Sequence, residues 1–128
     1  DTDRSRGLGD VYKRQAGYRV GLLIAPVILI DSWKELYVEL LNTLFERLSD
    51  KVKSEMFLEV IFMTYSYVQN AINNQAFPGA LRLYNRELMT GRGRGKYYYR
   101  QEYRDEAEAF LIKEIKNRFK SAEIVYVV

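Results

Sequence analysis

Apolar residues gather in three runs that predict strands. Residues 20–27 are almost continuously apolar, which is typical of a parallel strand covered on both faces. We expect this central strand to end before Pro26, because proline cannot donate a hydrogen bond within an interior ladder. Residues 56–64 form a second, β-branched and aromatic run. Residues 124–128 form the third run, and the sequence thus predicts three strands.

Residues between the runs show helical spacing. Residues 33–48 carry a broad apolar stripe at i, i+3, i+4 spacing, and residues 101–120 predict a second long helix. Ser32 and Glu35 stand at the spacing of a capping box, so we expect the first helix to begin there. Residues 49–55 are expected to be a polar connection. Alternating strands and helices predict an α/β fold with parallel strands and crossover helices.

A short helix is predicted from Tyr67 to about Gln75, with its apolar residues packed inward; they are Val68, Ala71 and Ile72. Glu59 is the one charged residue of the second strand. One interpretation places Glu59 at a barrel rim or in a hydrated lumen. The other places it in a functional site.

Composition excludes several classes of function. The chain has 128 residues, which suits one domain, and it contains neither cysteine nor histidine. Disulfides, thiolate metal sites, cysteine nucleophiles and imidazole catalysis are therefore excluded for this chain acting alone. No apolar run reaches the ~20 residues of a membrane-spanning helix, and no secretory signal is visible. We expect a cytoplasmic protein without a membrane partner.

The first residues predict a non-native tail. Residues 10–15 (DVYKRQ) match the in-frame translation of the transposase mosaic end that is joined to DNA fragments in sequencing libraries. We therefore expect residues 1–15 to derive from an adapter and residues 16–128 to be the C-terminal part of a longer protein. The alternative is a genuine basic tail.

Positive charge is concentrated in residues 82–104. This segment holds seven arginines and lysines against two glutamates, together with five of the eleven tyrosines. Its glycines at 91, 93 and 95 permit a tight turn and close approach of the backbone to a ligand. Residues 87–90 and 96–100 predict the two arms of a hairpin around a tip at residues 91–95.

This basic hairpin, residues 87–100, has the chemistry of a nucleic-acid contact. Arginine offers a planar fork to phosphate oxygens, and a tyrosine face can stack on a base, at ~1–3 kcal/mol per base. The alternative interpretation is a flexible basic hairpin whose tyrosines pack on the body of the domain.

Four segments together resemble the C-terminal part of the spore photoproduct lyase family. In order, they are residues 17–27 (GYRVGLLIAPV), 33–35 (WKE), 62–66 (FMTYS) and 93–97 (GRGKY). Residues 122–126 (AEIVY) resemble the last strand of that family. The resemblance covers residues 16–128.

The resemblance implies a radical S-adenosylmethionine (SAM) enzyme that reverses the thymine dimer formed in ultraviolet-irradiated spore DNA. It implies the C-terminal portion of a partial (β/α) barrel plus the basic hairpin. Family members bind a [4Fe–4S] cluster through three cysteines of a C-x₃-C-x₂-C loop and generate a 5′-deoxyadenosyl radical from SAM. This chain has no cysteine, so we expect it to hold neither cofactor and to be inactive alone.

The resemblance also assigns roles in the hairpin, which in the family enters DNA around the flipped lesion. The matching positions are Gly93, Gly95, Lys96 and Tyr97. Gly91 and Arg92 depart from the pattern, since an arginine and a tyrosine are expected there.

We expect Arg92, Arg94 and Lys96 to neutralise phosphates of damaged DNA, and Tyr97 and Tyr99 to pack against displaced bases. The other expected partner is the N-terminal half of the barrel, and exposed strand edges predict self-association. The competing hypothesis is a non-enzymatic α/β module that binds single-stranded nucleic acid.

Overall fold

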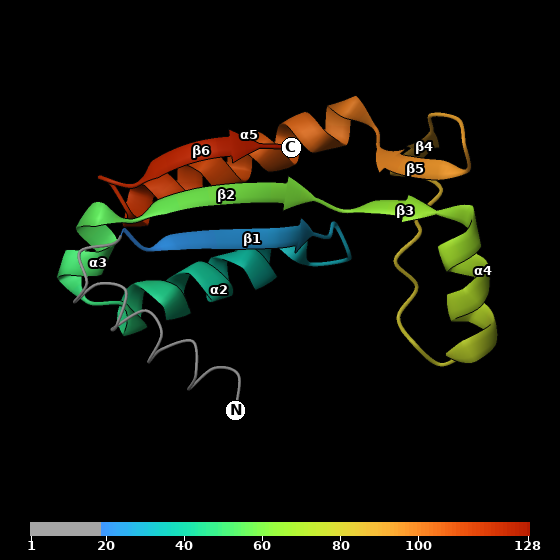
Figure 1. Cartoon of the computed structure of the whole chain (residues 1–128), viewed down its shortest axis with the longest axis horizontal. Helices are drawn as coiled ribbons and strands as arrows, with labels where there is room; N and C mark the ends of the chain where they lie inside the picture. The colour runs from blue at the N-terminus through green and yellow to red at the C-terminus, as the bar shows by residue number, and fades with distance from the viewer. Residues whose placement is uncertain (1–18) are drawn as a thin grey trace.

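A computed structural model describes residues 19–128, so the expected adapter-derived tail, residues 1–15, lies outside the described residues. Three parallel strands form the main sheet in the order β1 (Gly21–Val27), β2 (Phe57–Phe62) and β6 (Glu123–Val127). The three predicted strands and their parallel arrangement are thus confirmed (Figure 1).

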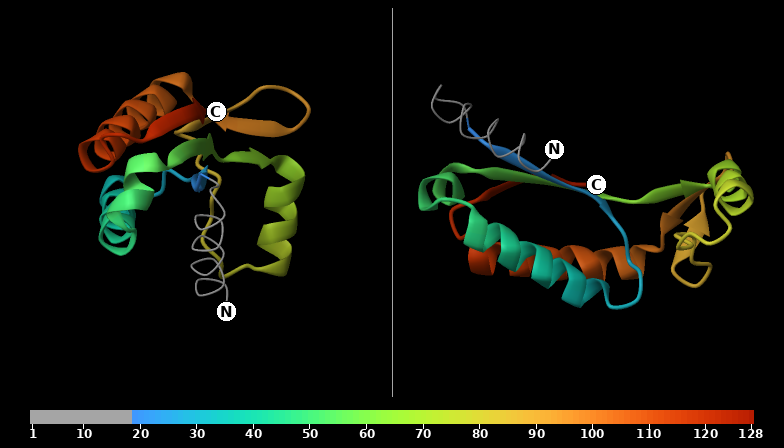
Figure 2. Two further views of the ribbon diagram at one scale, coloured as in Figure 1. Left: turned by 60° about the vertical axis from the view of Figure 1, so that its left-hand side comes forward. Right: turned by 90° about the horizontal axis from the view of Figure 1, so that it is seen from below.

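Two long helices, α2 (Trp33–Arg47) and α5 (Gln101–Arg118), cover one face of this sheet (Figure 2). The hydrophobic core lies between the sheet and these two helices: Leu58 of β2 is fully buried, and Leu111 of α5 is 1% exposed. Trp33 and Phe110 join the two helices edge to face, with ring centroids 5.3 Å apart. Burial of these apolar side chains on one side of the sheet is the main stabilising term of the fold.

The opposite face of the main sheet is open in the described part of the chain. Leu23 of β1 is 59% exposed, and it pairs with Glu59 of β2. The Glu59 carboxylate accepts a hydrogen bond of 3.1 Å from the Tyr126 hydroxyl. Partial desolvation raises the pKa of Tyr126, and this bond and the nearby negative charge raise it further. The expected cover on both faces of β1 is therefore missing from residues 19–128.

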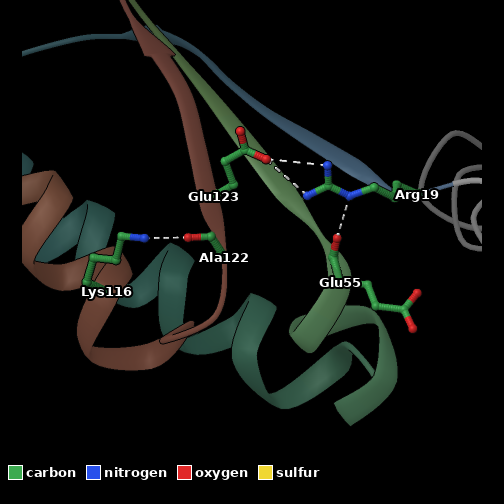
Figure 3. A network of polar contacts seen from close by, with 5 residues as sticks. All are labelled: Arg19, Glu55, Lys116, Ala122 and Glu123. Atoms are coloured by element: carbon green, nitrogen blue, oxygen red, sulfur yellow. Dashed lines mark hydrogen bonds and ion pairs between the residues drawn. The ribbon is translucent and has the colours of Figure 1, made fainter.

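Arg19 joins the strands at the amino end of the sheet (Figure 3). Its guanidinium donates to the Glu55 carbonyl at 3.0 Å, pairs with the Glu123 carboxylate at 3.3 Å and lies over the Phe57 ring at 5.2 Å. The Phe57 ring covers Gly21, where an added Cβ would come within 2.3 Å of it. A larger residue at that point of β1 would force the Phe57 ring to move.

Two details at the start of the chain differ from expectation. β1 continues through Pro26 to Val27, because the ladder shifts register between Ile24 and Val27 and β1 is the edge strand of the described sheet. The predicted capping box is also wrong. Ser32 has a left-handed backbone (φ 63°) and makes no side-chain cap bond; instead the Trp33 amide donates to the Ile30 carbonyl in a tight turn.

The connections also hold more helix than expected. The predicted polar link contains α3 (Asp50–Glu55), whose cap Ser49 accepts a hydrogen bond from the Val52 amide. Helix α4 (Tyr67–Ala76) confirms the predicted short helix, but its inward packing is wrong. Val68 is 65% exposed and Ile72 is 52% exposed, because α4 stands beyond the sheet and away from α2 and α5 (Figure 1).

A second, antiparallel sheet lies past the carboxyl ends of β1, β2 and β6 (Figure 1). Its strand order is β3 (Thr64–Ser66), β5 (Lys96–Tyr99) and β4 (Met89–Gly91). Because only Met63 separates β2 from β3, one extended segment carries the small sheet directly from the main one. Between residues 19 and 128, no helix has the length and apolar character needed to cross a membrane.

Candidate nucleic-acid interface

Strands β4 and β5 form the predicted basic hairpin. Gly91 pairs with Tyr97, and the Lys96 amide donates to the Gly93 carbonyl at 3.2 Å to close the turn. Arg94 and Gly95, the two central residues, both have positive φ, 56° and 69°. This is the mirror-image turn that matches the twist of paired strands and that glycine favours. The alternating glycines therefore fix the shape of the tip.

The tip is bound to the start of α4. The Tyr67 amide donates to the Gly95 carbonyl at 2.7 Å. Ser66, the residue before α4, caps the helix by accepting a hydrogen bond from the Gln69 amide at 2.9 Å. The hairpin is thus held at its tip as well as at its base, which favours a pre-formed binding surface over the loose loop of the alternative interpretation.

Three basic side chains stand at the tip. Arg92, Arg94 and Lys96 are all exposed, and within residues 19–128 no carboxylate forms an ion pair with any of them. Arg92 lies over the ring of Tyr98, with its guanidinium carbon 4.9 Å from the ring centroid. The tip therefore offers positive charge that the described part of the chain does not neutralise.

The tyrosines of β5 have three different surroundings. Tyr97 is half-buried and packs against Tyr84, with ring centroids 4.7 Å apart. Tyr98 is half-buried beneath Arg92. Tyr99 is 3% exposed, and its hydroxyl accepts a hydrogen bond of 2.9 Å from the Leu29 amide.

Burial raises the pKa of Tyr99, although the bond from Leu29 opposes the shift. Tyr99, which the sequence assigned to displaced bases, lies in the core, and we leave it out of the proposed contact surface. The alternative interpretation, that the tyrosines pack on the domain, fits this residue.

A cavity of about 290 Å³ lies at the foot of the hairpin. It brings Arg92 and Tyr98 next to Phe62, at the end of β2, and to Arg104 of α5. Sequence reasoning counted Arg104 among the basic residues but assigned it no role. Tyr98 and Phe62 were missed as well, because no spacing along the chain indicates that these three segments meet.

The residues of this chain do not fit an iron–sulfur cluster. Such clusters are held by cysteine thiolates, and the chain contains none. In the described residues, no three carboxylates gather closely enough to hold a metal ion.

The chain is similar to known proteins over most of its length. The family model described as spore photoproduct lyase matches residues 7–128. A spore photoproduct lyase of Clostridium acetobutylicum is 31% identical over 119 residues, covering 88% of this chain and 34% of the relative. One from Geobacillus sp. is 30% identical over 115 residues, covering 87% of this chain and 34% of that protein.

Solved structures give the same result. A spore photoproduct lyase mutant with bound AdoMet and dinucleoside spore photoproduct superposes with a TM-score of 0.79 at 25% identity, over 89% of this chain and 35% of that one. The expected fold, a mixed α/β fragment of a partial barrel, is confirmed. The chain spans about a third of the length of these relatives. It belongs to the spore photoproduct lyase family and corresponds to a fragment of the proteins in that family.

Proposed function

We propose that residues 16–128 are the C-terminal part of a radical SAM lyase that repairs thymine-dimer photolesions, and that the β4–β5 hairpin contacts the damaged DNA. The observation that carries the proposal is the group of three basic side chains, Arg92, Arg94 and Lys96, which form no ion pair within residues 19–128 and stand on a turn held at its tip and its base. Family membership supplies the class of substrate.

Charge and shape support contact with a distorted duplex. Each phosphate that a basic side chain neutralises releases a counterion, and this supplies affinity without sequence preference. Extruding a base costs a few kcal/mol of stacking, least at a damaged site, and phosphate contacts beside the lesion offset that cost. Tyr97, half-buried against Tyr84, presents part of its ring beside the tip, where an unstacked base can lie.

The remaining two-thirds of the family's length supplies the other chemistry in this proposal. That part would hold the cluster and SAM, which would supply the radical chemistry. This chain includes no cysteine to hold the cluster, and the part that we propose for its own residues is to bind and position DNA.

The test is the salt dependence of binding between the 1–128 chain and a duplex that contains one spore photoproduct. The variant R92Q/R94Q/K96Q removes three charges from the tip. The matched control K51Q/K113Q/K120Q removes three exposed charges. Lys51 lies in α3, Lys113 lies in α5, and Lys120 follows the end of α5. We expect the tip variant to lower the slope of log K against log salt by about 2–3 units and the control to change it by less than about one. Equal slopes for the two variants would refute contact by the tip.

The genomic reading frame tests the enzymatic part of the proposal. A C-x₃-C-x₂-C motif encoded within about 150–250 residues before Ala16, the usual size of a barrel domain, is the expected finding. A start codon at this position with no such motif upstream would contradict it and would leave the single-stranded nucleic-acid module as the function.

A further inference from the structure

The cavity at the foot of the hairpin adjoins the exposed tip and shares Arg92 with it. Its walls include Phe62 and Val128 at the carboxyl ends of the parallel strands, Arg92 and Tyr98 from the hairpin, and Gln101 and Arg104 from α5. This is the end of the sheet at which parallel α/β folds bind ligands. No acidic side chain of the described residues lines it.

Arg104 is held in place while part of its hydrogen-bonding capacity is still available. Its side chain is 24% exposed and lies over the Phe62 ring at 5.1 Å. One terminal nitrogen donates to the Val127 carbonyl at 3.3 Å, and the other reaches the Glu108 carboxylate only at 4.0 Å. A guanidinium has five N–H donors, so these two contacts leave donors for a ligand and compensate the charge weakly.

Arg92, which also lines the cavity, has the same arrangement. It too lies over an aromatic ring, that of Tyr98, and makes no ion pair within residues 19–128. A ring covers one face of each guanidinium and leaves the in-plane donors, which are the ones that match phosphate oxygens. Two basic side chains therefore line the cavity, one from the hairpin and one from α5.

Two further features indicate an anion of moderate size. Gln101 is the first residue of α5, an 18-residue helix, so the positive end of the helix dipole borders the cavity. A volume of about 290 Å³ lies at the small end of ligand pockets, which suits one phosphodiester with part of its sugar.

We propose that Arg92 and Arg104 together bind one backbone phosphate of the DNA, as a second anchor behind the tip. The inference rests on the proposed function for the identity of the ligand. The choice of a phosphate group as the ligand rests on the residues that line the cavity. A phosphodiester of DNA and a free phosphate share this chemistry, so the experiment includes both.

The experiment compares Arg104→Gln with Arg118→Gln in the 1–128 chain. Arg118 lies in the same helix and pairs with Glu114 at 3.3 Å, so it is a matched arginine outside the cavity. For a spore-photoproduct duplex, we expect Arg104→Gln to lower the salt slope by about one unit and to weaken binding by about tenfold, with little change for Arg118→Gln. Arg104→Lys, which keeps the charge, should retain the slope and lose affinity. It also serves if the glutamine variant folds poorly.

A second arm titrates inorganic phosphate and follows the arginine side-chain N–H signals by NMR. We expect the Arg92 and Arg104 signals to shift and the Arg118 signal to remain in place.

The two arms separate the two proposals. If R94Q/K96Q, which leaves Arg92 in place, lowers the DNA slope while Arg104→Gln leaves it unchanged, the second anchor is refuted and the hairpin proposal stands. If the chain does not bind DNA but phosphate still shifts Arg104, the proposed function fails and the cavity is a site for free phosphate. No response of Arg104 in either arm overturns the inference.

Discussion

The two sheets of this chain use their side chains in opposite ways. The parallel sheet β1-β2-β6 buries aliphatic residues such as Leu58 and Val60 beneath α2 and α5. The antiparallel sheet β3-β5-β4 buries only a few side chains, those of Tyr65, Met89 and Tyr99, and leaves its charged side chains in solvent. Stability and DNA contact should therefore separate by region, because few residues serve both.

The largest effect is expected from Leu58→Ala in the central strand β2. Leu58 is fully buried against the helices, and its truncation leaves a cavity that should cost about 2–5 kcal/mol of unfolding free energy. Urea denaturation measures the loss. Leu23→Ala is the control, because Leu23 is 59% exposed on the open face of the same sheet, and it should cost less than about 1 kcal/mol. Similar losses for the two would show that the open face is covered.

Tyr99→Phe tests the link between the sheets. Without the hydroxyl, the buried Leu29 amide loses its acceptor, and the unfolding free energy should fall by about 1–3 kcal/mol. The salt slope of DNA binding should not change. Tyr98→Phe is the matched neighbour, since no hydrogen bond to its hydroxyl is found in the described part, and it should be nearly neutral. A change of DNA slope in Tyr99→Phe would return this residue to the contact surface.

Alkaline pH should weaken the same link. Burial raises the pKa of both Tyr37 and Tyr99 in the folded state, and their hydroxyls accept hydrogen bonds from the successive amides of Ile28 and Leu29. The unfolded tyrosines lose their protons first. Stability should therefore be full below pH ~10 and fall as the pH rises from there through the raised folded pKa values. Urea midpoints across this range should fall less steeply in Tyr99→Phe; an unchanged profile would contradict the account.

The smallest effect on stability is expected from Arg94→Gly. Arg94 has a φ of 56°, which costs a non-glycine residue roughly 1 kcal/mol, so glycine should stabilise the hairpin by up to that amount. The salt slope should nevertheless fall by about 0.9. Arg92→Gly is the comparison, because Arg92 has no positive φ and loses the same charge without relief of strain. Stabilisation by both substitutions would contradict the strain argument.

The sequence predicts the strands of the main sheet and the two arms of the hairpin, but not β3 or the surroundings of these elements. Apolar runs and helical spacing predict the strands and helices because these signals are local, and the glycines at 93 and 95 predict the turn. Which of three consecutive tyrosines enters the core depends on Leu29, which is 70 positions away. The exposure of Val68 and Ile72 and the closeness of Arg104 to Arg92 depend likewise on where distant segments meet.

The most direct test of the DNA-binding hairpin is an NMR footprint of the 1–128 chain with a short duplex that carries one spore photoproduct. The account predicts that the perturbed backbone amides gather at residues 91–98 and around Arg104, while α3 and the end of α5 remain unchanged. Perturbation centred on α2 or on the open face around Glu59, with a silent hairpin, would contradict it.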